Sequence, residues 1–191
     1  MLFLFFVCEI IQLIFDLYIE RGDMAMSDNE KIFYDLKTAV EKYKRTVYGI
    51  AVTQLNSKHE ADDVFQEVFL TYHRKKPSFE SEEKLKAWLI TVTVNKCRQF
   101  NHSSYNSRVD KSSEPEIPVF AAFDRQDSDV FNAIRSLTPN YREVVYLHYC
   151  LGYSVTETAE LLSLRPNTVS MRLNRAKKQL KKRLEGYGYE T

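Results

Sequence analysis

Two helix signatures in succession, separated by a short turn, dominate the C-terminal part of the sequence. Ser154 and Glu157 have the spacing of a capping box, in which the serine hydroxyl and the glutamate carboxylate satisfy backbone amides at a helix start. Pro166 opens the next apolar repeat, and proline is favoured in the first turn of a helix. Helices over 155–162 and 166–184, joined by three residues, predict a helix-turn-helix.

The second of these helices carries a single apolar stripe. At about 100° per residue, intervals of 4, 3, 4 and 4 residues place all its members on one face, which is expected to pack inward. The opposite face is then open to a partner. The stripe consists of Val169, Leu173, Ala176, Leu180 and Leu184.

Positive charge gathers on the rest of this helix. Eight basic residues and no acidic one lie between Arg165 and Arg183, although the whole chain has 27 basic and 26 acidic residues and a net charge of only +1. Basic helices are often merely solvated, but a basic helix inside a helix-turn-helix favours DNA binding. Arg175 and Lys178 are suited to donate to guanine O6 and N7. The candidate base and phosphate contacts are Asn167, Ser170, Met171, Arg172, Asn174, Arg175 and Lys178.

The sequence lacks motifs for catalysis. Its five glycines form neither a phosphate-binding loop nor a nucleophile elbow. The three cysteines, Cys8, Cys97 and Cys150, are widely spaced, as in a protein of the reducing cytoplasm. His148 and Cys150 lack the second ligand pair of a zinc site and are interpreted as packed helix residues. We therefore predict a cytoplasmic binding protein with no catalytic residue, no cofactor and no metal.

The N-terminal half shows the same helical period. Capping-box spacings at Ser27 with Glu30 and at Ser57 with Glu60 predict that the first folded element begins near Ser27 and that a second helix spans 58–73. The apolar positions of the first element are Ile32, Leu36, Val40, Tyr43, Val47, Ile50 and Val52, and those of the second are Ala61, Val64 or Phe65, Val68 and Tyr72.

A third helix is predicted over 84–100, after the break at Pro77. Its segment WLITVTV (88–94) is rich in β-branched residues and alternates, which by itself favours a strand. We predict a helix because no second strand candidate exists to pair with it. The residues that share its buried face would be Leu85, Trp88, Leu89 and Val92.

Serine, asparagine and proline without a sustained period fill residues 101–128, which is typical of a linker. Beyond it, helices are predicted over 129–137 and 139–151, the latter with Thr138-Pro139 as its start and Gly152 as its stop. The chain is therefore expected to be all-α. Its parts would be an N-terminal extension over 1–26, two small helical domains over 27–103 and 129–187, and a flexible linker over 104–128.

Residues 2–19 form an apolar run close to the roughly 20 residues that cross a bilayer. Glu9, Gln12 and Asp16 interrupt it on one helical face, and each central carboxylate opposes insertion by about 3 kcal/mol. A secretory signal would need an early basic residue, which this run lacks. We therefore predict no membrane insertion.

The residues before Met24 suggest a different origin for this run. Residues 20–23, Glu-Arg-Gly-Asp, can be back-translated to a purine-rich ribosome-binding sequence, and thymine-rich upstream DNA would encode apolar residues. The favoured hypothesis is that residues 1–23 are a translated leader and that Met24 or Met26 is the native start. An amphipathic extension and a true membrane span remain the alternatives.

A second polar surface is expected on the helix over 58–73. His59, Asp63, Gln66 and Glu67 lie opposite its apolar side. Acidic residues on an exposed helix are often only solvated, and a general acid pair would need a base, nucleophile or metal that the sequence does not offer. Docking to a basic partner is the functional interpretation.

Three segments carry a resemblance to a known family. EADDVFQEVFL (60–70) resembles the polymerase-binding helix of sigma-70 family factors, and KLKAWLITVTVNKCR (84–98) is similar to the minus-10 region that follows it. Residues 137–180 resemble the minus-35 region almost end to end. Because the two regions are joined directly by a linker, the chain resembles the extracytoplasmic-function (ECF) group of this family.

The resemblance implies a sigma factor that binds core RNA polymerase and directs transcription initiation at promoter DNA. The helix over 166–178 would read the minus-35 element, and an anti-sigma factor is a further candidate partner. The implied polymerase-binding residues are Asp63, Gln66 and Glu67, and the implied minus-10 residues, after a reading loop over 77–84, are Lys84, Asn95, Lys96 and Arg98.

Departures from the family pattern limit what the resemblance carries over. Ser170 replaces a commonly basic residue and Met171 a small one, so the promoter sequence of relatives cannot be copied. Ser163 and Asn167 stand where glycines are usual. Two rival interpretations remain at this point: a stand-alone helix-turn-helix transcriptional regulator, and a membrane-tethered signalling adaptor.

Overall fold

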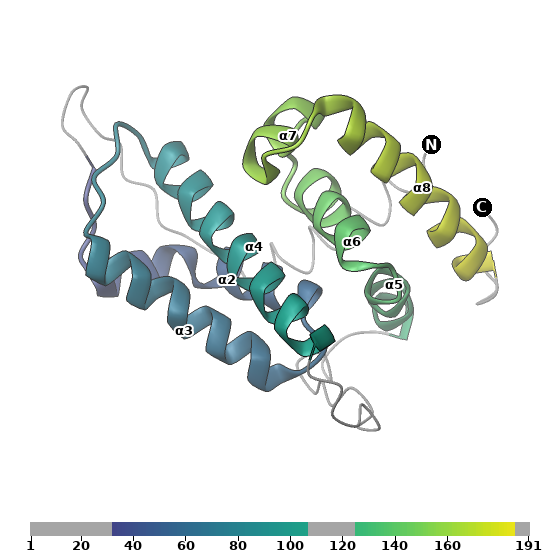
Figure 1. Cartoon of the computed structure of the whole chain (residues 1–191), viewed down its shortest axis with the longest axis horizontal. Coiled ribbons are helices and arrows are strands. Elements are labelled where there is room, and N and C mark those ends of the chain that lie inside the picture. The colour runs from purple at the N-terminus through teal and green to yellow at the C-terminus, as the bar shows by residue number, and fades with distance from the viewer. Residues whose placement is uncertain (1–31, 107–124, 186–191) are drawn as a thin grey trace. The chain divides into compact units, whose positions relative to one another are not determined.

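The computed structural model of the chain describes residues 32–106 and 125–185, which belong to two separate compact units (Figure 1). Within these ranges every regular element is a helix, and the only strand-like pairing is one isolated β-bridge. The predicted all-α class is therefore confirmed. No helix in the described ranges is long and apolar enough to span a membrane. The predicted leader lies outside the described residues.

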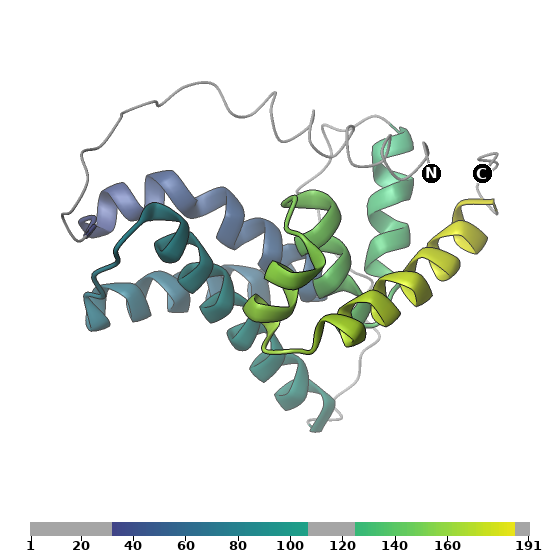
Figure 2. The same cartoon turned by 90° about the horizontal axis from the view of Figure 1, so that it is seen from above.

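The N-terminal unit is a bundle of three helices, α2 (Leu36–Gln54), α3 (Lys58–Lys75) and α4 (Glu82–Asn106). Each of the three packs against the other two, and Figure 2 shows them again as neighbours from above. Their apolar faces form one core because each helix buries the stripe that its sequence period predicts. The largest contributors that are almost fully buried are Val47, Leu55, Val64, Val68, Tyr72, Leu85 and Leu89.

The first helix begins later than its period predicts. Asp35 caps α2, since its carboxylate accepts from the Thr38 amide at 3.0 Å. Ile32, predicted on the helical stripe, instead forms a β-bridge with Phe79, with N···O distances of 2.6 and 3.0 Å. The predicted start near Ser27 lies outside the described residues.

Helix α3 starts where the sequence predicts, but its capping box is only half formed. The Ser57 hydroxyl accepts from the Glu60 amide at 3.1 Å, whereas the Glu60 carboxylate accepts from Asn56 at 3.4 Å. The β-branched segment 88–94 lies inside α4, as predicted. Its Thr93 hydroxyl, which is buried, donates to the Leu89 carbonyl at 2.6 Å and so stays satisfied within the helix.

The C-terminal unit holds α5 (Arg125–Arg135), α6 (Pro139–Val145), a π-helix η2 (Tyr146–Cys150), α7 (Val155–Leu162) and α8 (Pro166–Glu185). Helix α8 packs against α5, α6 and α7. The bounds of α7 match the prediction, and α8 ends one residue later. Helix α4 reaches Asn106 and α5 begins at Arg125, so helix extends into both ends of the predicted linker over 104–128.

The predicted helix over 139–151 is interrupted. After Val145 the backbone widens into the π-helix, and the Leu151 amide donates to the Tyr146 carbonyl, five residues back, at 3.0 Å. Gly152 then turns the chain with φ of 75°, a conformation that glycine adopts readily. The His148 ring contacts the Tyr153 carbonyl through Nδ1 at 2.7 Å, so this histidine ties the end of η2 to the turn.

Candidate nucleic-acid interface

Local hydrogen bonds fix the start of α7, and the turn from α7 to α8 is closed by the Leu164 amide, which donates to the Ala159 carbonyl at 2.8 Å. The Ser154 hydroxyl accepts from the Glu157 amide at 3.2 Å, and the Glu157 carboxylate accepts from the Ser154 amide at 2.8 Å. This hydrogen bonding lowers the pKa of Glu157 below its ordinary value. At the other end of α7, Ser163 adopts a left-handed conformation with φ of 55°. The complete capping box and the tight turn confirm the predicted helix-turn-helix.

The inner face of α8 is the predicted stripe. All five of its members are buried, and Val169 and Ala176 have no exposed surface. Because these residues fix how the helix rotates about its axis, they also determine which side chains face outward.

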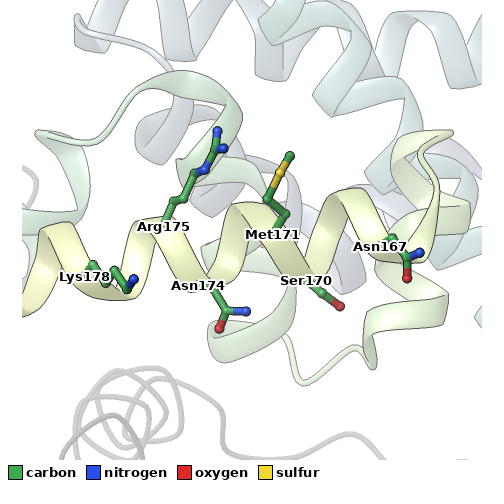
Figure 3. A pocket seen from close by; sticks show the side chains of 6 residues that line it. All are labelled: Asn167, Ser170, Met171, Asn174, Arg175 and Lys178. Carbon is green, nitrogen blue, oxygen red and sulfur yellow. The ribbon is translucent and has the colours of Figure 1, made fainter.

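The outer face of α8 forms an open hollow of about 370 Å³. Figure 3 shows Met171 and Arg175 pointing to one side of the helix, and Ser170 and Asn174 to the other. The lining residues, called the α8 face below, are Asn167, Ser170, Met171, Asn174, Arg175 and Lys178. They are six of the seven residues that the sequence singles out as candidate DNA contacts.

Arg172, the seventh candidate, lies on the flank of α8 and is engaged inside the unit. Its Nη1 donates to Oε1 of Glu143 on α6 at 2.7 Å, and the Glu143 side chain is only 2% exposed. A buried ion pair fixes orientation more than it adds stability. The pair therefore orients α8 against α6, a role that the sequence did not reveal because the two residues are 29 positions apart.

A second polar surface lies on α3 and is called the α3 face: Asp63, Gln66 and Glu67. Asp63 and Gln66 are exposed and Glu67 is half-buried. The neighbouring Asp62 accepts from the Tyr48 hydroxyl at 3.0 Å, and burial raises the pKa of Tyr48 to about 12. Asp62 thus serves the fold. Leu70, which sequence analysis did not select, is 46% exposed one turn beyond Gln66.

Glu67 is paired with two cations. Its Oε2 lies 3.3 Å from Nζ of Lys96 on α4 and 3.6 Å from Nη2 of Arg74. Lys96 is a candidate minus-10 residue and Glu67 a candidate polymerase-binding residue. The structure therefore brings together two residues that the sequence assigns to different partners.

The other candidate minus-10 residues share one face of α4. At about 100° per residue, Lys84, Asn95 and Arg98 fall within a narrow arc, while Lys96 lies toward α3. Asn95 and Lys84 are exposed, Arg98 is half-buried, and the Lys84 ammonium pairs with Glu80. Lys84, Asn95 and Arg98 thus form a polar strip along α4, apart from the α3 face.

The loop before α4 is held against the core of its unit. The β-bridge to Ile32 fixes the Phe79 backbone, and the Phe79 ring packs on Trp88 with centroids 5.8 Å apart. Trp88 also contacts Tyr72, with centroids 6.1 Å apart. Trp88 therefore packs on the core, as the sequence analysis expected.

Comparison with protein-family models assigns both units. Residues 39–102 match the model for sigma-70 region 2, and residues 129–180 match the model for sigma-70 region 4. The chain belongs to the sigma-70 family. Region 2 covers most of α2 to α4, and region 4 covers most of α5 to α8. The α3 face and the polar strip of α4 therefore lie in sigma region 2, and the α8 face lies in sigma region 4.

Curated relatives place this sigma factor in the ECF group. It is 26% identical over 163 residues to the ECF RNA polymerase sigma factor SigW of Bacillus subtilis (strain 168), which covers 76% of this chain and 86% of SigW. It is 27% identical over 162 residues to the ECF sigma factor SigM of Mycobacterium tuberculosis (strain H37Rv), covering 81% and 79% of the two chains. The predicted family is thus confirmed.

Solved structures share the fold. The sigma factor RpoE from Bartonella quintana, in complex with the anti-sigma factor NepR, superposes with a TM-score of 0.63 at 24% identity, over 79% of this chain and 97% of that chain. CnrH, in complex with the cytosolic domain of CnrY, gives a TM-score of 0.57 at 22% identity, over 79% and 88%. The function of the chain is to direct transcription initiation as a sigma factor. The stand-alone regulator is not favoured.

Proposed function

We propose that this sigma factor docks on core RNA polymerase with the α3 face and reads promoter DNA with α4 and α8. The observation that carries the proposal is the α8 face, an open, cationic surface on the second helix of a helix-turn-helix. Such helices enter the major groove, where base edges can be read. Transcription chemistry would stay with the polymerase, and the sigma factor would act by binding alone.

Polymerase docking is assigned to Asp63, Gln66 and Glu67. The first two side chains are exposed and Glu67 faces cations, so the surface suits a basic partner. The exposed Leu70 adds an apolar contact next to these polar groups. Interfaces of this kind gain most from a buried anchor surrounded by polar contacts.

The minus-10 element is assigned to α4 and the loop before it. Asn95, Arg98 and Lys84 share a face, and amide and cationic side chains suit base edges and phosphates. Lys96 joins them when its bond to Glu67 opens. The loop over 77–84 is held by Ile32 and Trp88, which gives its exposed residues a defined position.

The minus-35 element is assigned to the α8 face. Arg175 is suited to guanine, Asn174 to adenine, and Lys178 to guanine or a phosphate. Arg172 keeps further N–H groups beyond the one that binds Glu143, and these can donate to a phosphate. The two DNA-binding domains are proposed to span 27–103 and 129–187, with the linker over 104–128 between them.

We also propose a cytoplasmic location and an anti-sigma factor as a third partner. Both follow from the relatives, since sigma factors act on chromosomal promoters and RpoE was solved with an anti-sigma factor. Co-purification of the tagged chain from its native host tests the second point. Recovery of polymerase subunits alone, under inducing and non-inducing growth, would argue against a dedicated anti-sigma factor.

Run-off transcription tests the main proposal. Purified chain and core RNA polymerase are mixed with a pool of genomic promoter fragments, and transcripts are mapped. We expect a defined set of start sites that requires both proteins. Tight, sequence-specific DNA binding by the chain alone, with no transcription on adding core polymerase, would instead establish a stand-alone regulator.

A further inference from the structure

Met171 stands out on the α8 face because it is the one lining residue without a polar group. Its side chain is 45% exposed, and the other five members carry an amide, a hydroxyl or a positive charge. Single exposed apolar residues are common on protein surfaces. The position of Met171 in the middle of a polar, cationic hollow is what calls for a chemical explanation.

The residues around Met171 determine from which side a partner can contact its side chain. Figure 3 shows Arg175 beside it, with Ser170 and Asn174 pointing to the other side of the helix. Val169 and Leu173 face the core, whereas Met171 lies outside the buried stripe and is 45% exposed. A group that approaches the outer surface of α8 can therefore contact the exposed part of the thioether from solvent.

The major groove offers few apolar partners to such a side chain. Base edges there present hydrogen-bond donors and acceptors, and the exception is the C5-methyl group of thymine. Methionine is unbranched and polarizable, so it can fill the irregular space around a methyl group. We propose that Met171 contacts a thymine methyl in the minus-35 duplex and thereby sets the base preference at that position. The proposal rests on the assignment of α8 to the minus-35 element.

The spacing along α8 locates this thymine. Met171 and Arg175 are four residues apart, so their β-carbons are separated by about 6 Å. Base pairs are stacked about 3.4 Å apart along the duplex. The thymine read by Met171 should therefore lie within about two base pairs of the position read by Arg175. This relation gives the proposal a second, independent observable.

Selection from a DNA pool tests the preference. Core RNA polymerase is reconstituted with the wild-type chain, with Met171→Ala or with Met171→Leu, and each holoenzyme selects from promoters randomised in the minus-35 element. We expect a thymine at one position with the wild type, no preference there with alanine, and the thymine again with leucine. Since Met171 is exposed, neither substitution should impair folding, and circular dichroism spectra of the three proteins should overlay.

Removal of a single methyl group tests the contact itself. Replacing the selected thymine by deoxyuridine should weaken wild-type holoenzyme binding about three- to fivefold, the value of roughly one methyl group. Binding by Met171→Ala should not change. Lys178→Ala serves as the control, because it should weaken binding through a different contact of α8 and still distinguish thymine from deoxyuridine.

The outcomes distinguish failure of the role of Met171 from failure of the assignment of α8 to the minus-35 element. A sharp minus-35 preference that is identical for wild type and Met171→Ala, or equal loss of affinity on deoxyuridine for both, overturns the role of Met171 alone. The same holds if the lost thymine lies far from the position that Arg175→Ala relaxes. A pool with no minus-35 preference for any holoenzyme overturns the assignment of α8 as well.

Discussion

The binding surfaces of the two units differ in how their charged side chains are engaged. On α8, Arg175 and Lys178 make no ion pair with another described residue. On α3 and α4, by contrast, Glu67 contacts Lys96 and Arg74, and Lys84 pairs with Glu80. The α8 face is thus ready for a polyanion, whereas the N-terminal surfaces must exchange internal partners for external ones.

The largest effect is expected at the α3 face. Asp63→Ala combined with Glu67→Ala should weaken binding to core RNA polymerase by about a hundredfold, or about 3 kcal/mol, because it removes the acidic groups of a docking surface. Fluorescence anisotropy of labelled sigma factor with core enzyme measures the loss. Glu41→Ala is the matched control, since it removes an exposed acid of α2 that pairs with Lys44 outside this face.

The result is informative only if the double variant folds. Both side chains are at least partly exposed, so unfolding curves should overlay those of the wild type within experimental error. Wild-type affinity in the double variant would move the docking surface away from α3.

The buried pair of the C-terminal unit should matter for stability. Glu143→Ala removes the partner of Arg172, whose side chain is only 19% exposed, and should destabilise this unit by about 3 kcal/mol. Native-state hydrogen exchange of amides in α6 and α8 measures the change, with amides in α3 as the internal reference. Glu143→Gln, which retains a hydrogen-bond acceptor, should lose less. Equal protection in all three proteins would contradict an anchoring role for the pair.

Arg175→Ala tests the α8 face, where the cations are not engaged in ion pairs with other described residues. Because Arg175 makes no ion pair within the described part of the chain, its removal should leave stability unchanged while it relaxes one minus-35 position by about 1–3 kcal/mol. Holoenzyme affinity for single-base promoter variants measures the effect. Lys181→Ala, beyond the α8 face and paired with Glu185 at 3.9 Å, should change no base preference. Uniform weakening across promoters would reduce Arg175 to a phosphate contact.

The end of α7 offers a gain in stability. Ser163 is a non-glycine residue at φ of 55°, where the β-carbon is strained, so Ser163→Gly should stabilise the C-terminal unit by about 1 kcal/mol. Ser163→Ala keeps the strain and should show no gain. Hydrogen exchange of α7 amides distinguishes the two. Lys76 at the end of α3, with φ of 43°, allows the same test in the other unit.

Sequence signals predicted the C-terminal unit well because they are local. The Ser154 capping box, Pro166 and the apolar stripe of α8 lie within the elements they define, and α7 and α8 have the predicted bounds or nearly so. The α8 face followed from the same period. The π-helix at 146–150 was not predicted, since apolar spacing over five residues does not distinguish it from an α-helix.

Long-range pairing accounts for what the sequence did not reveal. Ile32 fits the helical period but pairs with Phe79, which is distant in sequence. Arg172 with Glu143 and Lys96 with Glu67 are each separated by 29 positions. Periodicity identifies a residue's helical face, whereas its partner depends on how helices pack. The sequence motifs assign Glu67 and Lys96 to different partners, and they do not reveal that the two side chains contact each other.

The smallest expected effect concerns this meeting of Glu67 and Lys96. Both side chains are partly exposed, so their attraction should contribute about 0.5 kcal/mol. If polymerase docking requires Glu67 to leave Lys96, then Lys96→Ala should raise affinity for core enzyme about twofold at low salt. The gain stays small because Arg74 still holds the same carboxylate oxygen at 3.6 Å.

A double-mutant cycle decides whether the two residues are coupled. In a Glu67→Gln background, Lys96→Ala should leave core affinity unchanged, because the internal competitor no longer has a charged partner to hold. Lys44→Ala, which frees Glu41 on α2, is the control and should have no effect in either background. An equal gain from Lys96→Ala with and without Glu67 would mean that Lys96 repels the polymerase directly. The N-terminal surface would then be as open as the α8 face.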